Sequence, residues 1–384
     1  MDNARISRVA SIDILRGLVM ILMALDHTRD YFSNFPYNPT DLGHTHTAMF
    51  FTRWITHFCA PVFVFLAGTS AFLSLQRGKS KKSMSSQLFF RGLWLIVLEL
   101  TIIRWGWVFN LDYTTVFVQV IWAIGWSMIC LSMLIWLPYR IIFLFSILMI
   151  GGHNMLDRME FANNGNLWGI LHSGGDIKLF ESINVWVMYP LIPWIAVMSA
   201  GYCFGRIYTL PASDRNPWIY GIGLSAIALF ILIRFWNIYG DPSPWEIQET
   251  GWFTFLSFLN CTKYPPSLCY LLMTLGPAIV SLPLWEKLPA SINRVLAVYG
   301  KVPLFYYILH IYLIHALALL LAAILGFPIS IFTDGSWNFY EYGWGYGLAG
   351  VYFFWVLVVA LLYYPCYRFM LIKIHSKKWW LSYL

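Results

Sequence analysis

The sequence predicts an all-α, polytopic integral membrane protein, a bundle of about ten transmembrane helices with both termini in the cytoplasm. The composition is 59% hydrophobic and only 11% charged, whereas a soluble domain carries about 25% charged residues. The apolar residues also come in blocks of about 20, the length at which a helix crosses a hydrocarbon layer of about 30 Å. These two observations exclude a soluble globular protein.

Ten apolar segments are predicted to span the membrane: residues 11–29, 55–75, 88–109, 115–137, 139–152, 186–208, 217–237, 264–284, 296–324 and 346–370. The fifth is short for a span of about 20 residues. The first follows a polar lead-in without a small-residue cleavage pattern, so we expect it to be retained and not removed as a signal peptide.

If these segments alternate across the bilayer, most basic residues fall on one side, which the positive-inside rule identifies as the cytoplasm. They are Arg5, Arg8, Arg77, Lys79, Lys81, Lys82, Arg140, Arg206, Arg215, Lys287, Arg294, Arg368, Lys373, Lys377 and Lys378. Most acidic residues fall in long loops on the opposite side, at about 30–54, 153–185, 238–263 and 325–345. Long loops often carry binding or catalytic residues. We expect a single transmembrane domain over residues 1–384.

The charge and the cysteines exclude some other classes. The net charge of +7 is explained by the topology, so no nucleic-acid partner is expected. The six cysteines lie mostly within apolar segments and form no CxxC pair, which predicts neither a zinc site nor a disulfide framework. We expect no metal cofactor.

Ionisable residues inside a membrane are costly and indicate functional sites. The first segment, SIDILRGLVMILMALDH, carries Arg16, Asp26 and His27. Arg16 and His27 are eleven residues apart, three helical turns, so they share one face about 16 Å apart. This spacing suits a long substrate, with a cation holding phosphate near the cytoplasm and a base near the outer side. Alternatively, Arg16 only snorkels to the headgroups. Asp26 cannot share the face of His27, so its partner is expected elsewhere.

Two other segments also carry ionisable groups. Arg53 and His57 are four residues apart at the start of the second segment, and therefore lie on one face. The ninth segment contains His310 and His315 within an apolar helix. An intramembrane histidine can be a packing element with a single hydrogen bond, and that alternative stays open for both.

The segment CTKYPPSL places Lys263 and Tyr264 before two prolines at the start of the eighth span. Proline is favoured at the first turn of a helix, and a fixed cation there would suit an anionic or carbonyl group. An interfacial anchor of Lys and Tyr is the alternative.

Five blocks carry a family resemblance: SIDILRGLVMILMALDH, THFCAPVFVFLAGTSAFL, YPLIPWIAVMSAGYCFG, TKYPPSL and GKVPLFYYILH. In this order they resemble bacterial members of the heparan-alpha-glucosaminide N-acetyltransferase-like family, within the transmembrane acyl-CoA transferase superfamily. In the wider group an Arg and a His lie eleven residues apart on the first helix, and Arg16 and His27 match that pair.

The resemblance implies that an acyl group, most simply acetyl, passes from cytoplasmic acetyl-CoA to an amine or hydroxyl of a sugar on the outer side. It also implies the bilayer of a bacterial inner membrane as the location. In the lysosomal enzyme the position of His27 is Asn, and the active His lies in the following luminal loop. That loop offers His44 and His46 here, so the base is His27, His44 or His46.

We expect His27 to be the base, Asp26 its orienting carboxylate, and His57 or His310 the group that polarises the thioester. Four residues are expected to contact acyl-CoA: Arg16, Arg53, Lys263 and Tyr264. Both direct transfer and an acyl-enzyme are open, as is a homodimer.

Two other classes of protein are alternatives to an acyltransferase. The first is a proton-coupled transporter or flippase of a lipid or glycan, in which buried His and Asp would relay protons. It predicts inverted repeats and broken helices, and no internal repeat is found. The second, a membrane scaffold, would not explain the ionisable groups within the spans.

Overall fold

The fold is described from a computed structural model, which covers residues 10–159, 165–179, 182–376 and 378–383. Of the predicted cytoplasmic basic residues, Arg5, Arg8 and Lys377 lie outside the described residues. The chain is 73% helix and 4% strand, so the prediction of a mostly helical fold is confirmed. The described residues divide into two compact units, unit 1 (within residues 60–100 and 113–287) and unit 2 (within residues 10–59, 101–112 and 288–383). A single functional domain stays a prediction.

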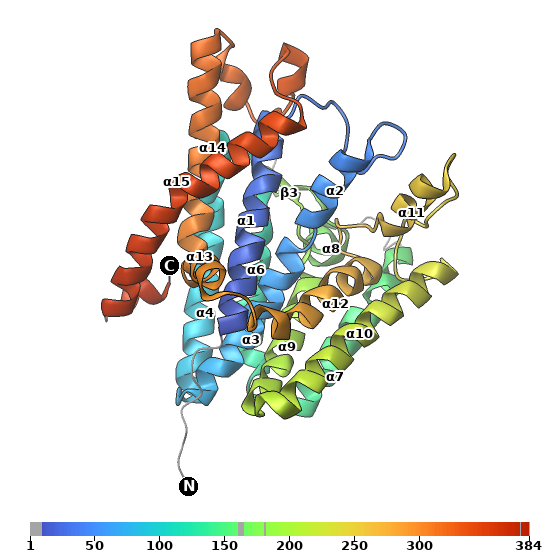
Figure 1. Cartoon of the computed structure of the whole chain (residues 1–384), viewed down its shortest axis with the longest axis vertical. Coiled ribbons are helices and arrows are strands. Elements are labelled where there is room, and N and C mark those ends of the chain that lie inside the picture. The colour runs from blue at the N-terminus through green and yellow to red at the C-terminus, as the bar shows by residue number, and fades with distance from the viewer. Residues whose placement is uncertain (1–9, 160–164, 180–181, 377, 384) are drawn as a thin grey trace. The chain divides into compact units, whose positions relative to one another are not determined.

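Unit 2 is built around α1 (Ala10–Phe32), which contacts α2 (Thr47–Thr56), α13 (Ala290–Lys301), α14 (Pro303–Leu325) and α15 (Leu348–His375), as Figure 1 shows. The short α5 (Arg104–Val108) also packs on α14. Three 3₁₀ turns complete the unit: Ile329–Phe332, Phe339–Tyr342 and Trp379–Ser382. Two indoles tie α1 to the C-terminal region, because Trp355 donates to the carbonyl of Ile21 (2.8 Å) and Trp344 to that of Tyr31 (2.8 Å).

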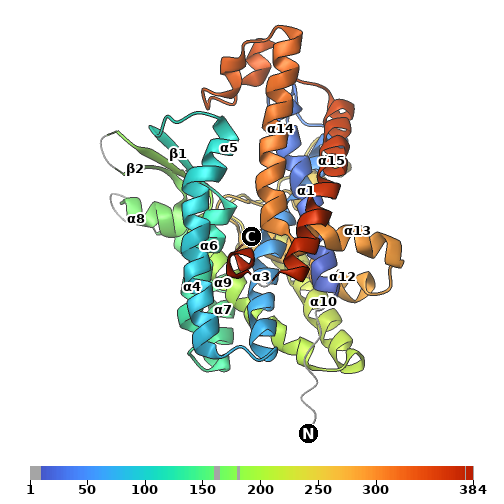
Figure 2. The ribbon, with the colours of Figure 1, turned by 90° about the vertical axis from the view of Figure 1, so that its left-hand side faces the viewer.

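Unit 1 contains most of α3 (Cys59–Gln76), with α4 (Lys81–Leu98), α6 (Val120–Leu134), α7 (Tyr139–Gly152) and α9 (Leu191–Phe204). It also contains α10 (Ala212–Trp236), α11 (Gly251–Leu259), α12 (Leu268–Trp285) and the single turn α8 (Asn166–Trp168). The helices pack in pairs, α4 with α6 (Figure 2), α7 with α9, and α10 with α12. A π-helical turn, Glu99–Ile103, joins α4 to α5, and 3₁₀ or π turns cover His153–Arg158, Gly169–Ser173 and Gly205–Thr209.

A small sheet in the described part of unit 1 corrects the all-α prediction. Strands β1 (Thr115–Val118) and β3 (Asn184–Val187) pair in parallel, and β2 (Gly175–Lys178) pairs antiparallel to β3. The first residues of the predicted spans 115–137 and 186–208 are therefore strands. The reason is local, because β1 alternates in burial and both segments are rich in β-branched and aromatic residues, which favour strands.

Each predicted span contains a helix, but the predicted number of about ten membrane-crossing helices is not confirmed. Among the described residues, seven helices are long and apolar enough to cross: 47–76, 81–108, 139–157, 212–236, 268–285, 303–325 and 348–375. The predicted span 296–324 is broken, since α13 ends at Lys301 and Val302 is not helical. Pro303 explains the break, because it disfavours helical geometry at the residue before it and fits the first turn of α14.

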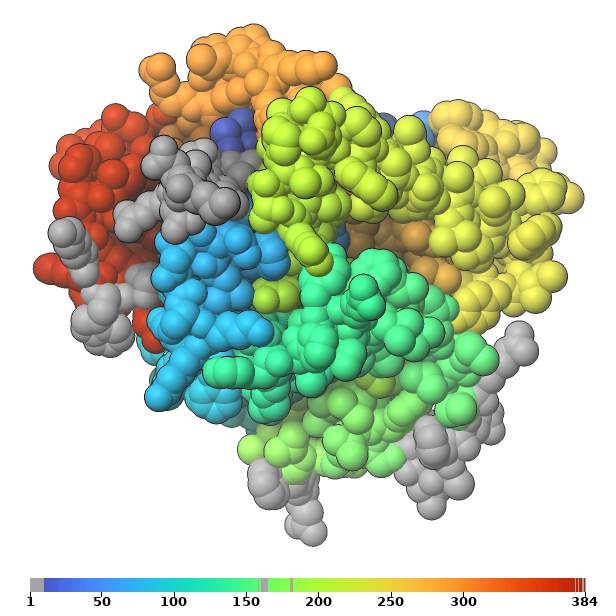
Figure 3. All heavy atoms as spheres, turned by 90° about the horizontal axis from the view of Figure 1, so that it is seen from below, coloured from blue at the N-terminus to red at the C-terminus, as the bar shows by residue number. Residues whose placement is uncertain are grey.

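Three turns of unit 1 lie at one end of the unit and are visible together in Figure 3. They join α3 to α4, α6 to α7, and α9 to α10. Four exposed basic residues on two of these turns are Lys79, Lys81, Lys82 and Arg140. The exposed Arg206 comes from the third turn, and its guanidinium lies 4.8 Å from the centre of the Tyr139 ring. One face of unit 1 is therefore strongly basic.

Glycines let the helices of unit 2 approach closely. A Cβ atom at Gly17 would lie 1.8 Å from the carbonyl oxygen of Leu296, and one at Gly300 would lie 1.8 Å from that of Asp13. Small residues at helix contacts are a common basis of packing in membranes. The contact of α1 with α13 therefore depends on both glycines.

We predict that Gly17→Ala lowers the free energy of unfolding by about 1–3 kcal/mol, the usual cost of overpacking. The matched control is Gly221→Ala in the interior of α10, where an added Cβ has nothing within 4 Å. Thermal unfolding in detergent micelles, followed by circular dichroism, measures both. Equal transition temperatures for the two variants would contradict the close contact.

Candidate active site

The candidate site in unit 2 centres on two histidines from α1 and α14. Nδ1 of His27 lies 2.7 Å from Nε2 of His310, although the residues are 283 positions apart. Their rings are nearly parallel, at 9°, with centroids 4.9 Å apart. His310 is fully buried, and its Nδ1 lies 3.0 Å from the carbonyl oxygen of Tyr306. The structure thus brings together two of the predicted catalytic residues.

These contacts determine which ring nitrogens of the neutral histidine pair carry hydrogen. A carbonyl oxygen can only accept, so Nδ1 of His310 donates to Tyr306. Nε2 of His310 is then an acceptor, and His27 must donate to it through Nδ1. The lone pair of His27 is therefore on Nε2. This is the tautomer that a histidine needs to act as a base through Nε2.

Aromatic rings enclose the His27 side chain. The edge of Trp107, from α5, packs on it with centroids 4.7 Å apart, and Tyr307 approaches at 6.1 Å. Tyr306 stacks on His310 from the other side, at 5.1 Å. Because α5 and α14 supply these rings, the imidazole of His27 is held by residues far away in sequence.

Asp26 pairs with arginines, and its predicted role as the orienting carboxylate of His27 stays a prediction. It accepts hydrogen bonds from Arg53 through both carboxylate oxygens, and Arg29 lies 2.9 Å from Oδ1. Arg29 also pairs with Asp30. These side chains are largely buried, and removing one partner from a buried ion pair costs about 3–5 kcal/mol. The geometry makes Asp26 a brace between α1 and α2.

The other predicted residues of unit 2 are Arg16, His57 and His315. Arg16, near the other end of α1, makes long contacts of 3.4 Å with Asp13 and 3.3 Å with the carbonyl of Gly300. His57 is buried at the C-terminal end of α2. His315 lies 2.9 Å from the carbonyl oxygen of Gly106 and stacks on Phe109, which is the packing role that the sequence left open.

The two alternative bases lie in the loop between α1 and α2 and are exposed. His44 lies 2.8 Å from Oδ2 of Asp41, and this hydrogen bond lowers the pKa of the Asp41 carboxyl below its usual range. His46 is the N-cap of α2, where its side chain accepts a hydrogen bond from the backbone N–H of Met49. His27 is the more enclosed of the three histidines.

Lys263 and Tyr264 belong to unit 1, in the loop before α12. Lys263 is buried, and its Nζ lies 5.1 Å from the centre of the Tyr264 ring. Tyr264 in turn contacts Tyr189, with centroids 5.4 Å apart. The ammonium of Lys263 thus lies over one aromatic ring, and the predicted binding of an anionic or carbonyl group there stays a prediction.

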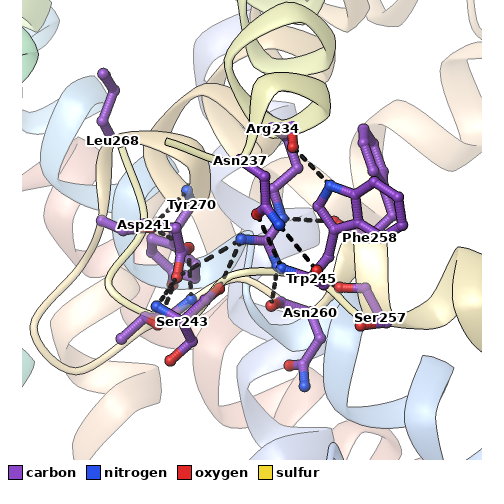
Figure 4. A network of polar contacts seen from close by, with 12 residues as sticks. Arg234, Asn237, Asp241, Ser243, Trp245, Ser257, Phe258, Asn260, Leu268 and Tyr270 are labelled. Carbon is purple, nitrogen blue, oxygen red and sulfur yellow. Dashed lines mark hydrogen bonds and ion pairs between the residues drawn. The ribbon is translucent and has the colours of Figure 1, made fainter. Parts of the chain in front are cut away.

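A buried polar network fixes this loop (Figure 4). Arg234 donates to four backbone carbonyls, those of Ser243, Ser257, Phe258 and Asn260. Asp241, 3.8 Å from Arg234, accepts from Thr262 and Ser267 on either side of Lys263. Since these buried groups are well satisfied, the loop that carries Lys263 is preorganised.

Sequence reasoning missed a second histidine and carboxylate pair, in unit 1. Nε2 of His172 lies 2.8 Å from Oδ1 of Asp157, and the ring of the buried His153 is 6.3 Å from that of His172. It also missed Arg29, although the run DHTRD places an arginine three residues after Asp26, where helical side chains meet.

Comparison with known proteins gives one informative result. A search of the curated proteins finds no match. The family model described as "Heparan-alpha-glucosaminide N-acetyltransferase, catalytic" matches residues 8–236, more than half of the chain. The matched range contains Arg16, His27 and Arg53 and ends before Lys263 and His310. The chain therefore belongs to the heparan-alpha-glucosaminide N-acetyltransferase catalytic family.

Proposed function

We propose that the chain is a membrane-bound acyltransferase, which moves an acyl group from cytoplasmic acyl-CoA to an amine or hydroxyl of a sugar on the outer side. Acetyl is the simplest acyl group, and the bacterial inner membrane is the proposed location. The observation that carries the proposal is the His27–His310 pair, within a chain that belongs to an N-acetyltransferase family. A base with a defined tautomer is what acyl transfer to an amine or hydroxyl needs.

In the proposed reaction Nε2 of His27 takes the proton from the acceptor as the acceptor nitrogen or oxygen attacks the thioester carbon. The resulting imidazolium keeps its Nδ1–H on His310, whose own Nδ1–H is held by the Tyr306 carbonyl. When the carbon–sulfur bond breaks, the CoA thiolate leaves and takes the proton from His27. The products are the acylated sugar and free CoA, so atoms and charge balance.

His310 orients His27 in this scheme, because in the neutral pair its Nε2 is already the acceptor for His27. His57 stays the proposed donor to the thioester oxygen, where a preorganised donor stabilises developing charge. Arg16 stays the proposed phosphate contact, along with Arg53, Lys263 and Tyr264. A direct transfer of this kind uses no metal.

The proposed orientation places both termini and the basic face of unit 1 in the cytoplasm. Basic residues near membrane spans favour that side, and the three turns that carry them lie at one end of unit 1. The proposed first span runs from residue 11 inside to residue 29 outside, so the end of α1 where His27 lies faces the outer side.

We predict that His27→Ala lowers acyl transfer by about 10²–10⁴-fold, the usual contribution of a positioned base. Binding of acyl-CoA should be unchanged, because the proposed phosphate contacts are elsewhere.

Arg16→Ala should give the reverse result, a weaker affinity for acyl-CoA with less effect on the chemical step. Single-turnover rates and calorimetric titration separate the two effects.

The outer-loop histidines supply the control for this experiment. His44→Ala and His46→Ala should retain most of the activity, because both side chains are exposed and lie in the outer loop. If His27→Ala turns over normally and either loop variant is inactive, the base lies in the loop and the assignment to His27 is wrong.

We also predict the sidedness. Reporter domains fused within residues 79–82 and at the C-terminus should be found in the cytoplasm, and one fused near Gly165 should be found outside. A cytoplasmic reporter at Gly165 would contradict the proposed orientation and, with it, transfer to an outer acceptor.

A further inference from the structure

A pocket of about 220 Å³ lies in unit 2 beyond the outer end of α1. Its walls are the last turns of α1, the segment that follows, and the turn Phe339–Tyr342 with the residues before it. Two kinds of side chain line it: an ion pair, Arg29 with Asp30, and aromatic rings, among them Tyr37, Trp337 and Tyr340. None of these residues was selected from the sequence.

Aromatic contacts connect this pocket to His27. The indole of Trp337 packs on Trp107, with centroids 5.5 Å apart, and Trp107 packs on His27 at 4.7 Å. Trp337 also contacts Tyr31 at 5.2 Å. Arg29 and Asp30 lie two and three residues after His27 on α1. A group bound in the pocket would therefore lie on the same end of α1 as the proposed base.

The backbone of Trp337 is in an uncommon conformation. Its φ is +59°, in the left-handed region that bulky residues rarely adopt. Such strained conformations are concentrated at functional sites. Here the conformation places a large indole in the wall of the pocket, between Tyr31 and Trp107.

We infer that this pocket binds one uncharged pyranose ring of the acceptor. An aromatic face packs against the C–H face of a sugar ring, and a carboxylate and a guanidinium beside it can accept from and donate to hydroxyl or amine groups. The volume is below the roughly 300–1,000 Å³ of sites for larger ligands, so it fits a single ring. This inference rests on the proposed function and identifies the place of its acceptor.

The charges of the site favour a neutral or weakly basic sugar over an acidic one. Asp26, Asp30, Arg29 and Arg53 form a connected cluster with equal numbers of acids and bases. No excess positive charge is present in this cluster to hold a carboxylate or sulfate. The side chain of Asp30 is 34% exposed, so one carboxylate of the cluster can reach a bound ligand.

Two tyrosines on one short turn offer a matched test. Tyr340 lines the pocket, whereas Tyr342, two residues later, does not and is more exposed, at 52% against 38%. Asp30→Asn has a similar control in Glu341→Gln, an exposed acid outside the pocket lining. The probes are methyl α-glucoside, methyl α-glucosaminide and methyl α-glucuronide, titrated onto the full chain in detergent without donor.

The wild-type protein should bind the glucoside or the glucosaminide more tightly than the glucuronide. Tyr340→Ala and Asp30→Asn should weaken that binding about fivefold or more, in the range of a lost aromatic or hydrogen-bonded contact. Tyr342→Ala and Glu341→Gln should bind as the wild type does. Saturation-transfer NMR measures the affinities, and circular dichroism checks that each variant is folded.

Two outcomes would overturn the inference: no binding of any glycoside by the wild type, or equal affinities in Tyr340→Ala, Asp30→Asn and their controls. Acyl transfer is measured separately. If the pocket variants lose glycoside binding but the wild type transfers no acyl group, the pocket stands and the proposed function fails. If transfer occurs and the Michaelis constant for the acceptor is the same in all variants, the pocket fails and the function stands.

Discussion

The hydrogen bond between His27 and His310 is the interaction on which the account depends. One carbonyl, that of Tyr306, determines which nitrogen of His310 carries hydrogen, and His310 in turn determines it for His27. A base is useful only if its lone pair is held in place, and contacts from α14 supply that constraint for His27, the proposed base. The neighbouring ion-pair cluster of Asp26 joins α1 to α2. The proposed base and the ion-pair cluster thus use adjacent residues that point about 100° apart on one helix.

Much of the helical architecture could be predicted from the sequence, because apolar blocks of about 20 residues are a strong signal. A helix lies in each of the ten predicted ranges, although in the described part of the chain seven helices have the length and composition needed to cross a membrane. The errors have local causes. Pro303 divides the predicted ninth span, and the segments before α6 and α9 pair as strands. Hydropathy does not distinguish a β-branched strand from the start of an apolar helix.

The site could be predicted only in part, because it depends on contacts between distant segments. Arg16, His27 and the face of Asp26 follow from helical periodicity within α1. The pairing of His27 with His310 does not follow from local periodicity, since α1 and α14 are separated by most of the chain. The pocket beyond α1 requires Trp337 to meet Trp107 and Tyr31, and no local pattern in the sequence indicates this meeting.

The tautomer of His27 tests this account most directly. Nitrogen-15 spectra of histidine-labelled protein report which ring nitrogen carries hydrogen, and the chain has nine histidines to resolve. Comparison with His27→Gln identifies the signal. We expect His27 to carry hydrogen on Nδ1 and a lone pair on Nε2, and His310→Ala to remove this preference. Hydrogen on Nε2 of His27 in the wild-type protein would contradict the proposed role of the His27–His310 pair.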